Sequence, residues 1–252
     1  MGYADGVTKI PGADVSFEDA ETLAYLAAQG PVRVHVTLTP QTLPDVESFN
    51  VIADLKGSER PDEVVIVSGH LDSWDLGQGA IDDASGVVVS AHVPFIIKAL
   101  GLRPKRTIRF IAWMNEENGG RGSAGYFDEQ KENLTKQFAA IEADLGASHP
   151  LGFFFAGKRE ALPYFQPISN VLRQQGAGLV QLQDGVGSDI GPLTTAGVPS
   201  FAPWFNQQTY FNYHHTEADT FDKISPRELA EVSSVMAVLA YGLANLEQPL
   251  PR

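Results

Sequence analysis

A histidine and several aspartates follow an apolar run at residues 64–68, within the sequence VVIVSGHLDSWDLGQGAIDDASG. The run is rich in β-branched residues, which is typical of a buried strand. His70 and Asp72 come just after it, and the carboxyl ends of strands are where open α/β sheets bind ligands. A glycine-rich turn then presents Asp82 and Asp83 ahead of a second apolar run. The pattern therefore predicts polar ligands held between two buried elements.

This set of side chains suits zinc. Zinc binds neutral imidazole nitrogen and carboxylate oxygen, and a ligating histidine commonly donates its other ring N–H to a carboxylate that fixes its orientation. Residues i and i+2 of a strand share a face, so we expect Asp72 to orient His70 without binding the metal itself. The alternative interpretation is a surface turn rich in aspartate and glycine, because short motifs also occur by chance.

Acidic residues end two further strand-like runs. Residues 107–114 precede Glu116 and Glu117, and residues 138–143 precede Asp144. Carboxylates gathered at one sheet edge repel one another unless cations or hydrogen bonds compensate for the charge. A two-metal site gives that compensation, because one carboxylate bridges both ions. An adjacent glutamate pair would also let one carboxylate bind metal while its neighbour moves protons.

Two more features bear on this site. Glu142 lies two residues before Asp144 and so competes with it for the same strand face. A loop near the C-terminus carries His214 and His215 in the run YHHTEADT, which adds imidazoles to the candidate ligands. Each of these residues taken singly also has a structural explanation, as a solvated or packed side chain.

The chain resembles the zinc-dependent aminopeptidase family with co-catalytic metals. The resemblance lies in the runs SGHLDSWDLGQGAIDDASG, EENGGRGS and YHHTEADT and in the strand end at Asp144, and it covers nearly the whole chain. It implies two zinc ions per chain, bound by residues at matching motif positions. The implied zinc ligands are His70, Asp82, Glu117, Asp144 and His215. Asp82 would bridge the ions, His70 would pair with Asp144 on one ion, and Glu117 with His215 on the other.

The implied activity is that of an exopeptidase that releases N-terminal residues from short peptides or splits dipeptides. Metal-activated water would be the nucleophile, and Glu116 would be the general base that passes its proton to the leaving amine. Many relatives have, where this chain has His214, a tyrosine that supports the oxyanion. His214 would help to hold the oxyanion in its place. Two alternatives stay open: a catalytically silent interaction domain on the same scaffold, and a single-zinc enzyme of amide or acyl-transfer chemistry.

Composition excludes several other classes of protein. The chain has 252 residues, of which 43% are hydrophobic, enough for one large α/β domain or a domain plus a fragment. The formal net charge of −13 argues against nucleic-acid partners and against adsorption to anionic membranes. The absence of cysteine excludes disulfides and thiolate metal sites. We find no apolar run near the roughly 20 residues of a membrane span, and no export signal at residues 1–10.

Two parts are expected along the chain. Residues 1–45 resemble the last part of a protease-associated-type insert that relatives carry, and residues 46–252 resemble the family's catalytic domain. In the first part we predict a helix with Ser16 as its N-cap. Residues 32–39 alternate apolar and polar side chains, which predicts a half-exposed strand. The proline-bounded segment 40–44 marks the boundary.

The resemblance implies an α/β fold with a mostly parallel mixed central sheet and helices on both faces. Further strands are predicted at residues 49–55, 153–155 and 198–205, and helices at 86–100, at 162–175 and from Ser225 to about 246. Pro94 lies inside the first of these helices, so we expect a kink or a break there. By resemblance the protein would act on short peptides, would form a homodimer and would be secreted or periplasmic.

Overall fold

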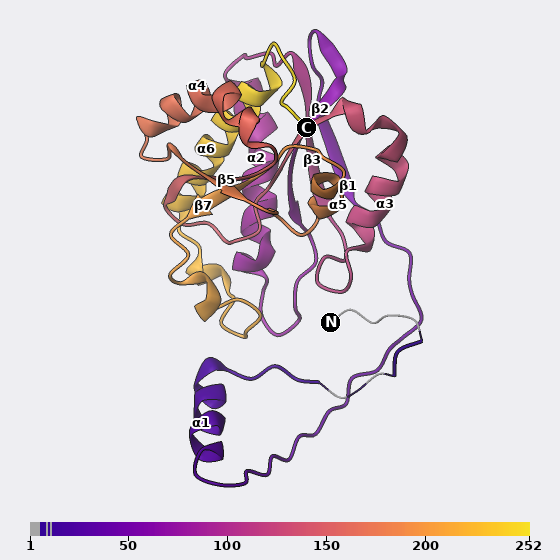
Figure 1. Ribbon diagram of the computed structural model, residues 1–252, viewed down its shortest axis with the longest axis vertical. Coiled ribbons are helices and arrows are strands. Elements are labelled where there is room, and N and C mark those ends of the chain that lie inside the picture. Colours follow the sequence, from indigo (N-terminus) through magenta and orange to yellow (C-terminus); the bar gives the residue numbers. More distant parts are fainter. Residues whose placement is uncertain (1–5, 9, 11) are drawn as a thin grey trace. The chain divides into compact units, whose positions relative to one another are not determined.

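The computed structural model describes residues 6–8, 10 and 12–252, and its main feature is a seven-stranded sheet (Figure 1). The strands are β1 (Val51–Leu55), β2 (Arg60–His70), β3 (Arg106–Trp113), β4 (Gln137–Glu142), β5 (Pro150–Ala156), β6 (Leu179–Gln183) and β7 (Ser200–Phe205). Their order across the sheet is β1-β3-β2-β4-β7-β5-β6. The β1/β3 and β5/β7 pairs are antiparallel, and the other neighbours are parallel. The predicted mostly parallel mixed sheet is therefore confirmed.

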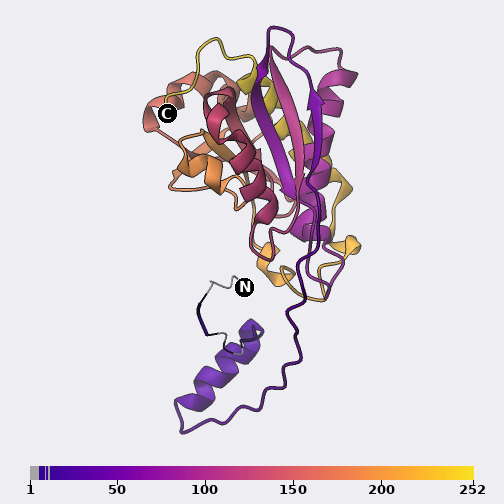
Figure 2. The ribbon, with the colours of Figure 1, turned by 90° about the vertical axis from the view of Figure 1, so that its right-hand side faces the viewer.

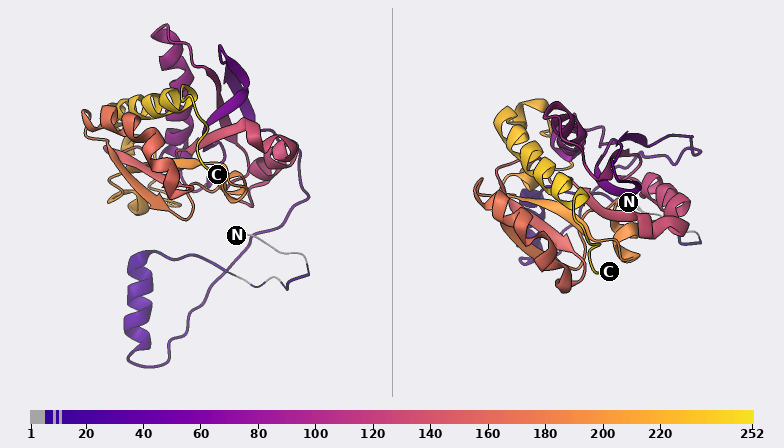
Figure 3. Two further views of the ribbon diagram at one scale, coloured as in Figure 1. Left: turned by 45° about the horizontal axis from the view of Figure 1, so that its top comes forward. Right: turned by 90° about the horizontal axis from the view of Figure 1, so that it is seen from above.

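Helices cover both faces of the sheet (Figure 3). One face carries α2 (Ser85–Ala99), α4 (Leu162–Arg173) and α6 (Pro226–Ala244), and the other carries α3 (Arg121–Gln130) and the short α5 (Gly191–Thr195). Side chains of β2 point alternately to the two faces of the sheet. Val65 and Val67 pack with α2 and α6, whereas Ile66 packs with α3 and α5. A strand covered on both faces is apolar throughout, which explains the continuous run at residues 64–68.

β2 begins earlier than the sequence indicates. Arg60 already pairs with Arg106 of β3, so the polar residues ahead of the apolar run also belong to the strand. Figure 2 shows β2 as a long strand in the sheet. Every residue from Val64 to His70 is buried, so the strand delivers His70 to its C-terminal edge from the middle of the sheet.

Helix α2 continues through Pro94, so the predicted break at this proline does not occur. Proline removes one intrahelical hydrogen bond, but Val89, Val93 and Ile97 are buried on the inner face of the helix. Their packing against the sheet offsets the lost hydrogen bond. By length and composition the segment Ala80–Ala99 could cross a membrane, yet 56% of its most apolar window is buried inside the protein, as in a core helix.

The last helix begins where its capping residues predict. Ser225 accepts a hydrogen bond from the backbone N–H of Glu228 at 3.3 Å, and Pro226 lies in the first turn. The sequence patterns do not predict α3, α5 or β6. Gly122 and Gly125 give α3 a low helix propensity, so its packing against the sheet decides its conformation.

Residues 1–47 form a unit separate from residues 48–252. Helix α1 (Phe17–Ala27) is present as predicted, with Ser16 accepting a hydrogen bond from the backbone N–H of Asp19 at 3.1 Å. None of the residues of α1 is buried.

The strand predicted at residues 32–39 is not present. These residues pair with no strand among the described residues, and Val34 is 62% exposed. An alternating pattern gives a strand one face to bury but does not supply an edge to pair with. The assignment of residues 1–45 to a protease-associated-type insert stays a prediction.

Candidate metal centre

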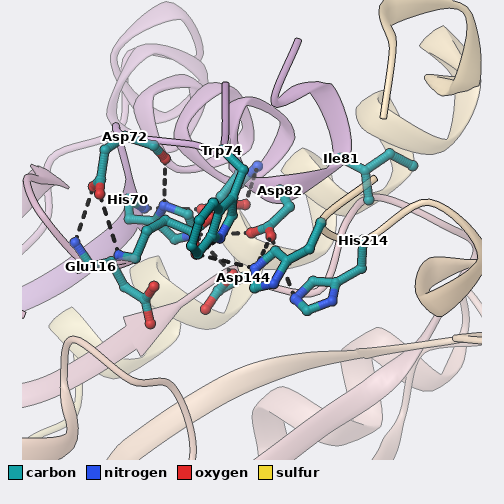
Figure 4. Close-up of polar contacts among 12 residues, drawn as sticks. His70, Asp72, Trp74, Ile81, Asp82, Glu116, Asp144 and His214 are labelled. Atoms are coloured by element: carbon teal, nitrogen blue, oxygen red, sulfur yellow. Dashed lines mark hydrogen bonds and ion pairs between the residues drawn. The ribbon is translucent and has the colours of Figure 1, made fainter. Parts of the chain in front are cut away.

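The predicted ligands come together at one edge of the sheet. β2 ends at His70, β3 is followed by Glu116 and Glu117, and β4 is followed by Asp144. Because β3, β2 and β4 are parallel neighbours, their carboxyl ends lie side by side. Asp82 reaches the same place from the turn that precedes α2, and Figure 4 shows His70, Asp82 and Asp144 grouped there.

The start of α2 is tied closely to this edge. A Cβ atom at Gly86 would lie 1.8 Å from the carbonyl oxygen of Ala143, so only glycine lets the helix approach the end of β4. The buried carboxylate of Asp83 accepts the backbone N–H of Gly86 and that of His70, each at 3.0 Å. The helix start is thereby fixed to the end of β2, which fixes Asp82 relative to His70.

The ring of His70 is held by both of its nitrogens. Nδ1 lies 2.8 Å from the carbonyl oxygen of Asp72. Nε2 lies 3.0 Å from Oδ1 of Asp82 and 3.3 Å from Oδ1 of Asp144, and the side chain is only 1% exposed. Donation of the Nδ1 proton to a backbone carbonyl leaves Nε2 as the coordinating nitrogen.

Asp72 acts through different atoms from those expected. Its backbone carbonyl, and not its carboxylate, contacts the imidazole of His70. The carboxylate accepts the backbone N–H groups of Glu116 at 3.0 Å and of Glu117 at 3.3 Å (Figure 4). Asp72 therefore positions His70 and also the segment that carries the glutamate pair.

A second group of ligand atoms forms on the other oxygen of Asp82. Its Oδ2 lies 3.0 Å from Nε2 of His215 and 3.5 Å from Nε2 of His214. Nε2 of His215 also lies 3.1 Å from Oε2 of Glu117, which accepts a 2.7 Å hydrogen bond from Nε1 of Trp74. His215 has φ of 56°, in the left-handed region that non-glycine residues seldom adopt outside functional sites.

The residues present fit a metal centre. Each of three sets of side chains offers nitrogen and oxygen atoms that lie within 4.8 Å of one another. The sets are His70 with Asp83 and Asp144, His70 with Asp82 and Glu117, and Asp82 with His214 and His215. Oε1 of Glu117 is buried and accepts no hydrogen bond from the described residues, which fits an oxygen that binds a cation. Imidazole and carboxylate are the donors that zinc takes in the absence of cysteine.

Burial and crowding shift the pKa values of these groups. Burial, followed by the charge of Asp82, raises the pKa of Glu117 to about 7. Burial also raises the pKa of Asp144. Burial by itself lowers the pKa of His70, but hydrogen bonds to Asp144 and Asp82 outweigh it and raise the pKa. Carboxylates and an imidazole that perturb one another in this way are typical of a functional site.

Glu116 and His214 lie beside the metal-ligand groups. The backbone of Glu116 is fixed by Asp72, and Figure 4 shows its carboxylate free of the drawn contacts. The ring of His214 stacks on that of His215, with centroids 3.6 Å apart. Burial lowers the pKa of His214, which favours a neutral ring. The structure thus brings both predicted catalytic residues to the site.

Two supporting residues are not predicted from the sequence as parts of the site. Trp74 holds Glu117, and the buried carboxylate of Asp219 accepts the backbone N–H groups of Ile81 at 2.6 Å and Asp82 at 3.1 Å. Both lie inside runs that carry predicted ligands, HLDSWD and YHHTEADT. Tryptophan is not a ligand type, and the sequence does not indicate whether Asp219 binds metal or backbone. Contacts between distant segments cannot be inferred from either run alone.

Glu142 does not compete with Asp144. Its buried carboxylate accepts the backbone N–H groups of Asp189 at 3.2 Å and Ile190 at 2.8 Å, so it holds a loop. That loop and the end of β4 line a cavity of about 450 Å³ beside Asp144. Its lining residues are Glu142, Asp144, Leu145, Asp184, Gly185, Val186, Gly187, Ser188, Gly191, Thr194, Thr195 and Ala202.

Comparison with known proteins identifies the family. Residues 50–240 match the model of peptidase family M28. The chain belongs to this family. The fold and the family that the sequence motifs imply are therefore confirmed.

The chain is similar to carboxypeptidase Q, as its motifs also indicate. It is 40% identical to carboxypeptidase Q of Rattus norvegicus over 251 residues, which are 99% of the chain and 53% of that protein. Identity to the Homo sapiens protein is 39% over the same length and share. The chain thus spans about half the length of these relatives.

Solved structures share the fold. The chain superposes on a peptidase M28 precursor from Shewanella amazonensis SB2B with a TM-score of 0.83 and 33% identity, over 99% of the chain and 57% of that structure. It superposes on a zinc aminopeptidase from Bacillus subtilis with a TM-score of 0.63 and 22% identity, over 81% of the chain and 52% of that structure.

Proposed function

We propose that this M28 chain is a zinc-dependent exopeptidase that removes N-terminal residues from short peptides or splits dipeptides. The observation that carries the proposal is the sharing of Asp82 between two groups of ligand atoms. Its Oδ1 faces His70 and its Oδ2 faces His215, with contacts of 3.0 Å on each side. A carboxylate that serves two sites at once is the signature of a two-metal hydrolase.

Two zinc ions fit the ligand groups as a pair. His70 and Asp144 would hold one ion, Glu117 and His215 would hold the other, and Asp82 would contribute to both. When bound, zinc polarises the scissile carbonyl and lowers the pKa of a water molecule. The carboxylates of Asp72 and Asp83 hold the backbone of these ligand segments in place without metal.

The chain supplies the proton transfer. Glu116 accepts a proton from the attacking water and passes it to the nitrogen of the leaving amine, because its carboxylate is near the ligands and is not used by another hydrogen bond in the site. His214 lies 3.5 Å from Asp82 and can donate a hydrogen bond towards the oxygen that becomes negative.

The neighbouring cavity favours an exopeptidase over an endopeptidase. Its volume of about 450 Å³ suits one amino-acid residue, and it opens next to Asp144. No lysine or arginine is among its lining residues, so no cationic side chain there repels the positively charged amino terminus of a peptide. The zinc aminopeptidase structure from Bacillus subtilis supports the same activity class by analogy.

The alternatives make different demands on the site. A silent interaction domain has no need for the five proposed ligands, and a single-zinc amide or acyl-transfer enzyme needs only one of the two groups. The homodimer and the secreted or periplasmic location that the resemblance implies both stay predictions, since the chain covers 53% of carboxypeptidase Q. The absence of nucleic-acid and membrane partners, expected from the net charge of −13, also stays a prediction.

Elemental analysis combined with turnover assays tests the proposal. The 252-residue chain is loaded with zinc, its metal content is measured, and it is offered aminoacyl chromogenic amides and dipeptides. Two zinc ions per chain with turnover of either substrate supports the proposal. One zinc ion per chain without peptide turnover supports the single-zinc alternative. Absence of turnover with no bound zinc, or with two zinc ions bound, supports the silent domain.

A further inference from the structure

Asp219 lies in the loop that carries His214 and His215, residues 213–220, which we call the histidine loop. It connects this loop to the turn that carries Asp82. It lies four residues after His215, is 4% exposed, and is used neither as a ligand nor as a base in the proposed function. Its two carboxylate oxygens accept different backbone donors, Ile81 N–H at 2.6 Å and Asp82 N–H at 3.1 Å. Figure 4 shows Ile81 beside Asp82, at the turn where these donors lie.

The same loop contacts Asp82 a second time through His215, whose Nε2 lies 3.0 Å from Oδ2 of Asp82. Asp82 is therefore held at its side chain by His215 and at its backbone by Asp219, two residues of one short segment. With the backbone N–H held, the carboxylate of Asp82 keeps one oxygen towards His70 and the other towards His215.

Other contacts reinforce this connection. The backbone N–H of Gln78 donates to the carbonyl of Asp219 at 2.7 Å, and the side-chain oxygen of Gln78 accepts the N–H of Phe221 at 2.8 Å. A Cβ atom at Gly77 would lie 2.8 Å from the carbonyl oxygens of Asp219 and Thr216, so the two segments approach as closely as glycine permits. The carboxylate of Asp219 lies at the centre of this contact.

We propose that Asp219 is a positioning residue that holds the histidine loop and the bridging carboxylate in register, so that binding at the Glu117 and His215 group depends on it. The proposal rests on the proposed function, because it assumes that Asp82 serves both ions. The ion at His70 and Asp144 should depend on Asp219 less, since those two ligands are fixed by β2 and β4.

The chemistry of the contact requires a carboxylate. Both oxygens of aspartate accept, whereas asparagine has one acceptor oxygen and places an N–H₂ donor opposite a backbone N–H donor. Asp219→Asn should therefore retain one of the two hydrogen bonds, and Asp219→Ala should lose both. Loss of a residue that orients metal ligands commonly weakens metal binding by about 10- to 100-fold.

The test compares zinc binding in Asp219→Ala, Asp219→Asn and the matched control Glu217→Ala, which removes an exposed carboxylate from the same loop. Calorimetric titration of the metal-free proteins with zinc reports the affinity of each site. We expect one of the two zinc affinities to fall by about 10- to 100-fold in Asp219→Ala and the other to change less, with a smaller loss in Asp219→Asn and no change in the control. Equal loss at both sites, or wild-type affinity in Asp219→Ala, would overturn the proposal.

Hydrogen exchange of the metal-free proteins separates this proposal from the proposed function. The amides of Ile81 and Asp82 should lose protection in Asp219→Ala and keep part of it in Asp219→Asn, while the amides of β2 stay protected. If the wild-type chain binds fewer than two zinc ions, the proposed function fails, and this exchange pattern still decides whether Asp219 holds the turn. Unchanged protection of these two amides would rule out the role of Asp219, and an alanine variant that unfolds leaves the asparagine variant to decide.

Discussion

The ligands of this site lie on two kinds of segment, the ends of strands and a loop. His70 is the last residue of β2 and Asp144 follows β4, two central strands that are hydrogen-bonded on both sides, and the side chain of His70 is 1% exposed. His215 lies in a loop outside the sheet, and its side chain is 40% exposed. The sheet alone fixes the first kind of ligand, whereas the second kind depends on side-chain contacts such as those of Trp74 and Asp219.

One residue, Asp82, joins the strand-borne and the loop-borne ligands. Asp82 contacts the strand-borne His70 through one oxygen and the loop-borne His215 through the other. Its backbone is fixed by Asp219 from the loop side, and the neighbouring Asp83 ties the turn to the strand side. Changes at Asp82 should therefore affect both regions, and changes elsewhere should affect one.

Substitution of Asp82 should have the largest effect. Asp82→Ala removes a ligand from both groups, so we expect loss of both metals and of all measurable peptidase activity. Elemental analysis after gel filtration, together with a dipeptide assay, measures this. Asp75→Ala, which removes an exposed carboxylate from the same turn, is the matched control and should behave as wild type. Full occupancy by two metals in Asp82→Ala would show that Asp82 does not bridge.

Substitution of Glu116 should separate chemistry from metal binding. Glu116→Gln removes the proton acceptor but no ligand, so kcat should fall by about 10²–10⁴-fold while the metal content stays near that of wild type. Steady-state kinetics with a chromogenic amide and elemental analysis of the same sample check both halves. Glu129→Gln, at an exposed position on α3, serves as the control. Retained turnover in Glu116→Gln would contradict the assignment of the base.

Removal of metal should loosen the loop more than the strands. Without cations the buried carboxylates of Asp82, Glu117 and Asp144 face one another, so the melting temperature should fall on chelation and recover when zinc returns. Zinc at roughly a thousandfold excess over Kd should stabilise the fold by about 4 kcal/mol. Hydrogen exchange should rise mainly at residues 210–223, with β2 little changed. A melting temperature that does not respond to chelation would contradict metal binding.

The smallest expected effect is that of Asp189, in the loop that Glu142 holds, on the pH dependence of stability. Burial, followed by the charge of Glu116, raises the pKa of Asp189 to about 7, so below that pH the folded state binds a proton that the unfolded chain releases near its ordinary pKa. Stability from this group is therefore present at low pH and is lost as the pH rises from about 4 to about 7.

Asp189→Asn should remove this dependence. We expect the variant to match wild type near pH 4 and to exceed its stability at pH 8 by on the order of 1–3 kcal/mol, because asparagine carries no buried charge. Urea denaturation of the metal-free protein across this pH range measures the difference, because zinc would leave its histidine ligands at the acidic end. Asp184→Asn, an exposed carboxylate on the same loop, is the control. Parallel stability curves for wild type and Asp189→Asn would show that the pKa of Asp189 is not raised.

Much of the site could be predicted because its ligands follow strands. A buried strand leaves a continuous apolar run in the sequence, and parallel neighbours bring their ends to one edge, so the sequence alone is enough to group His70, Glu117 and Asp144. His215 could be added only by resemblance of its motif, because nothing in the loop sequence says which strand end it meets.

Predictions made from local sequence patterns failed where neighbouring segments decide the conformation. Residues 32–39 have the alternation of a strand but pair with no strand among the described residues. A kink or a break was expected at Pro94, and α2, with buried residues on both sides of the proline, continues through it without a break. Local patterns report what a segment prefers, and packing decides whether that preference is realised.

The sequence by itself determined the class of fold, the family and the types of ligand, because apolar runs, turn glycines and motif spacing are local properties of the chain. Only the tertiary structure decided that the carbonyl of Asp72, and not its carboxylate, contacts His70, that Glu142 holds a loop, and that Asp219 holds the turn before α2. These contacts join residues whose relative distance and orientation are set by the packing of the whole sheet and its helices, which no single stretch of sequence records.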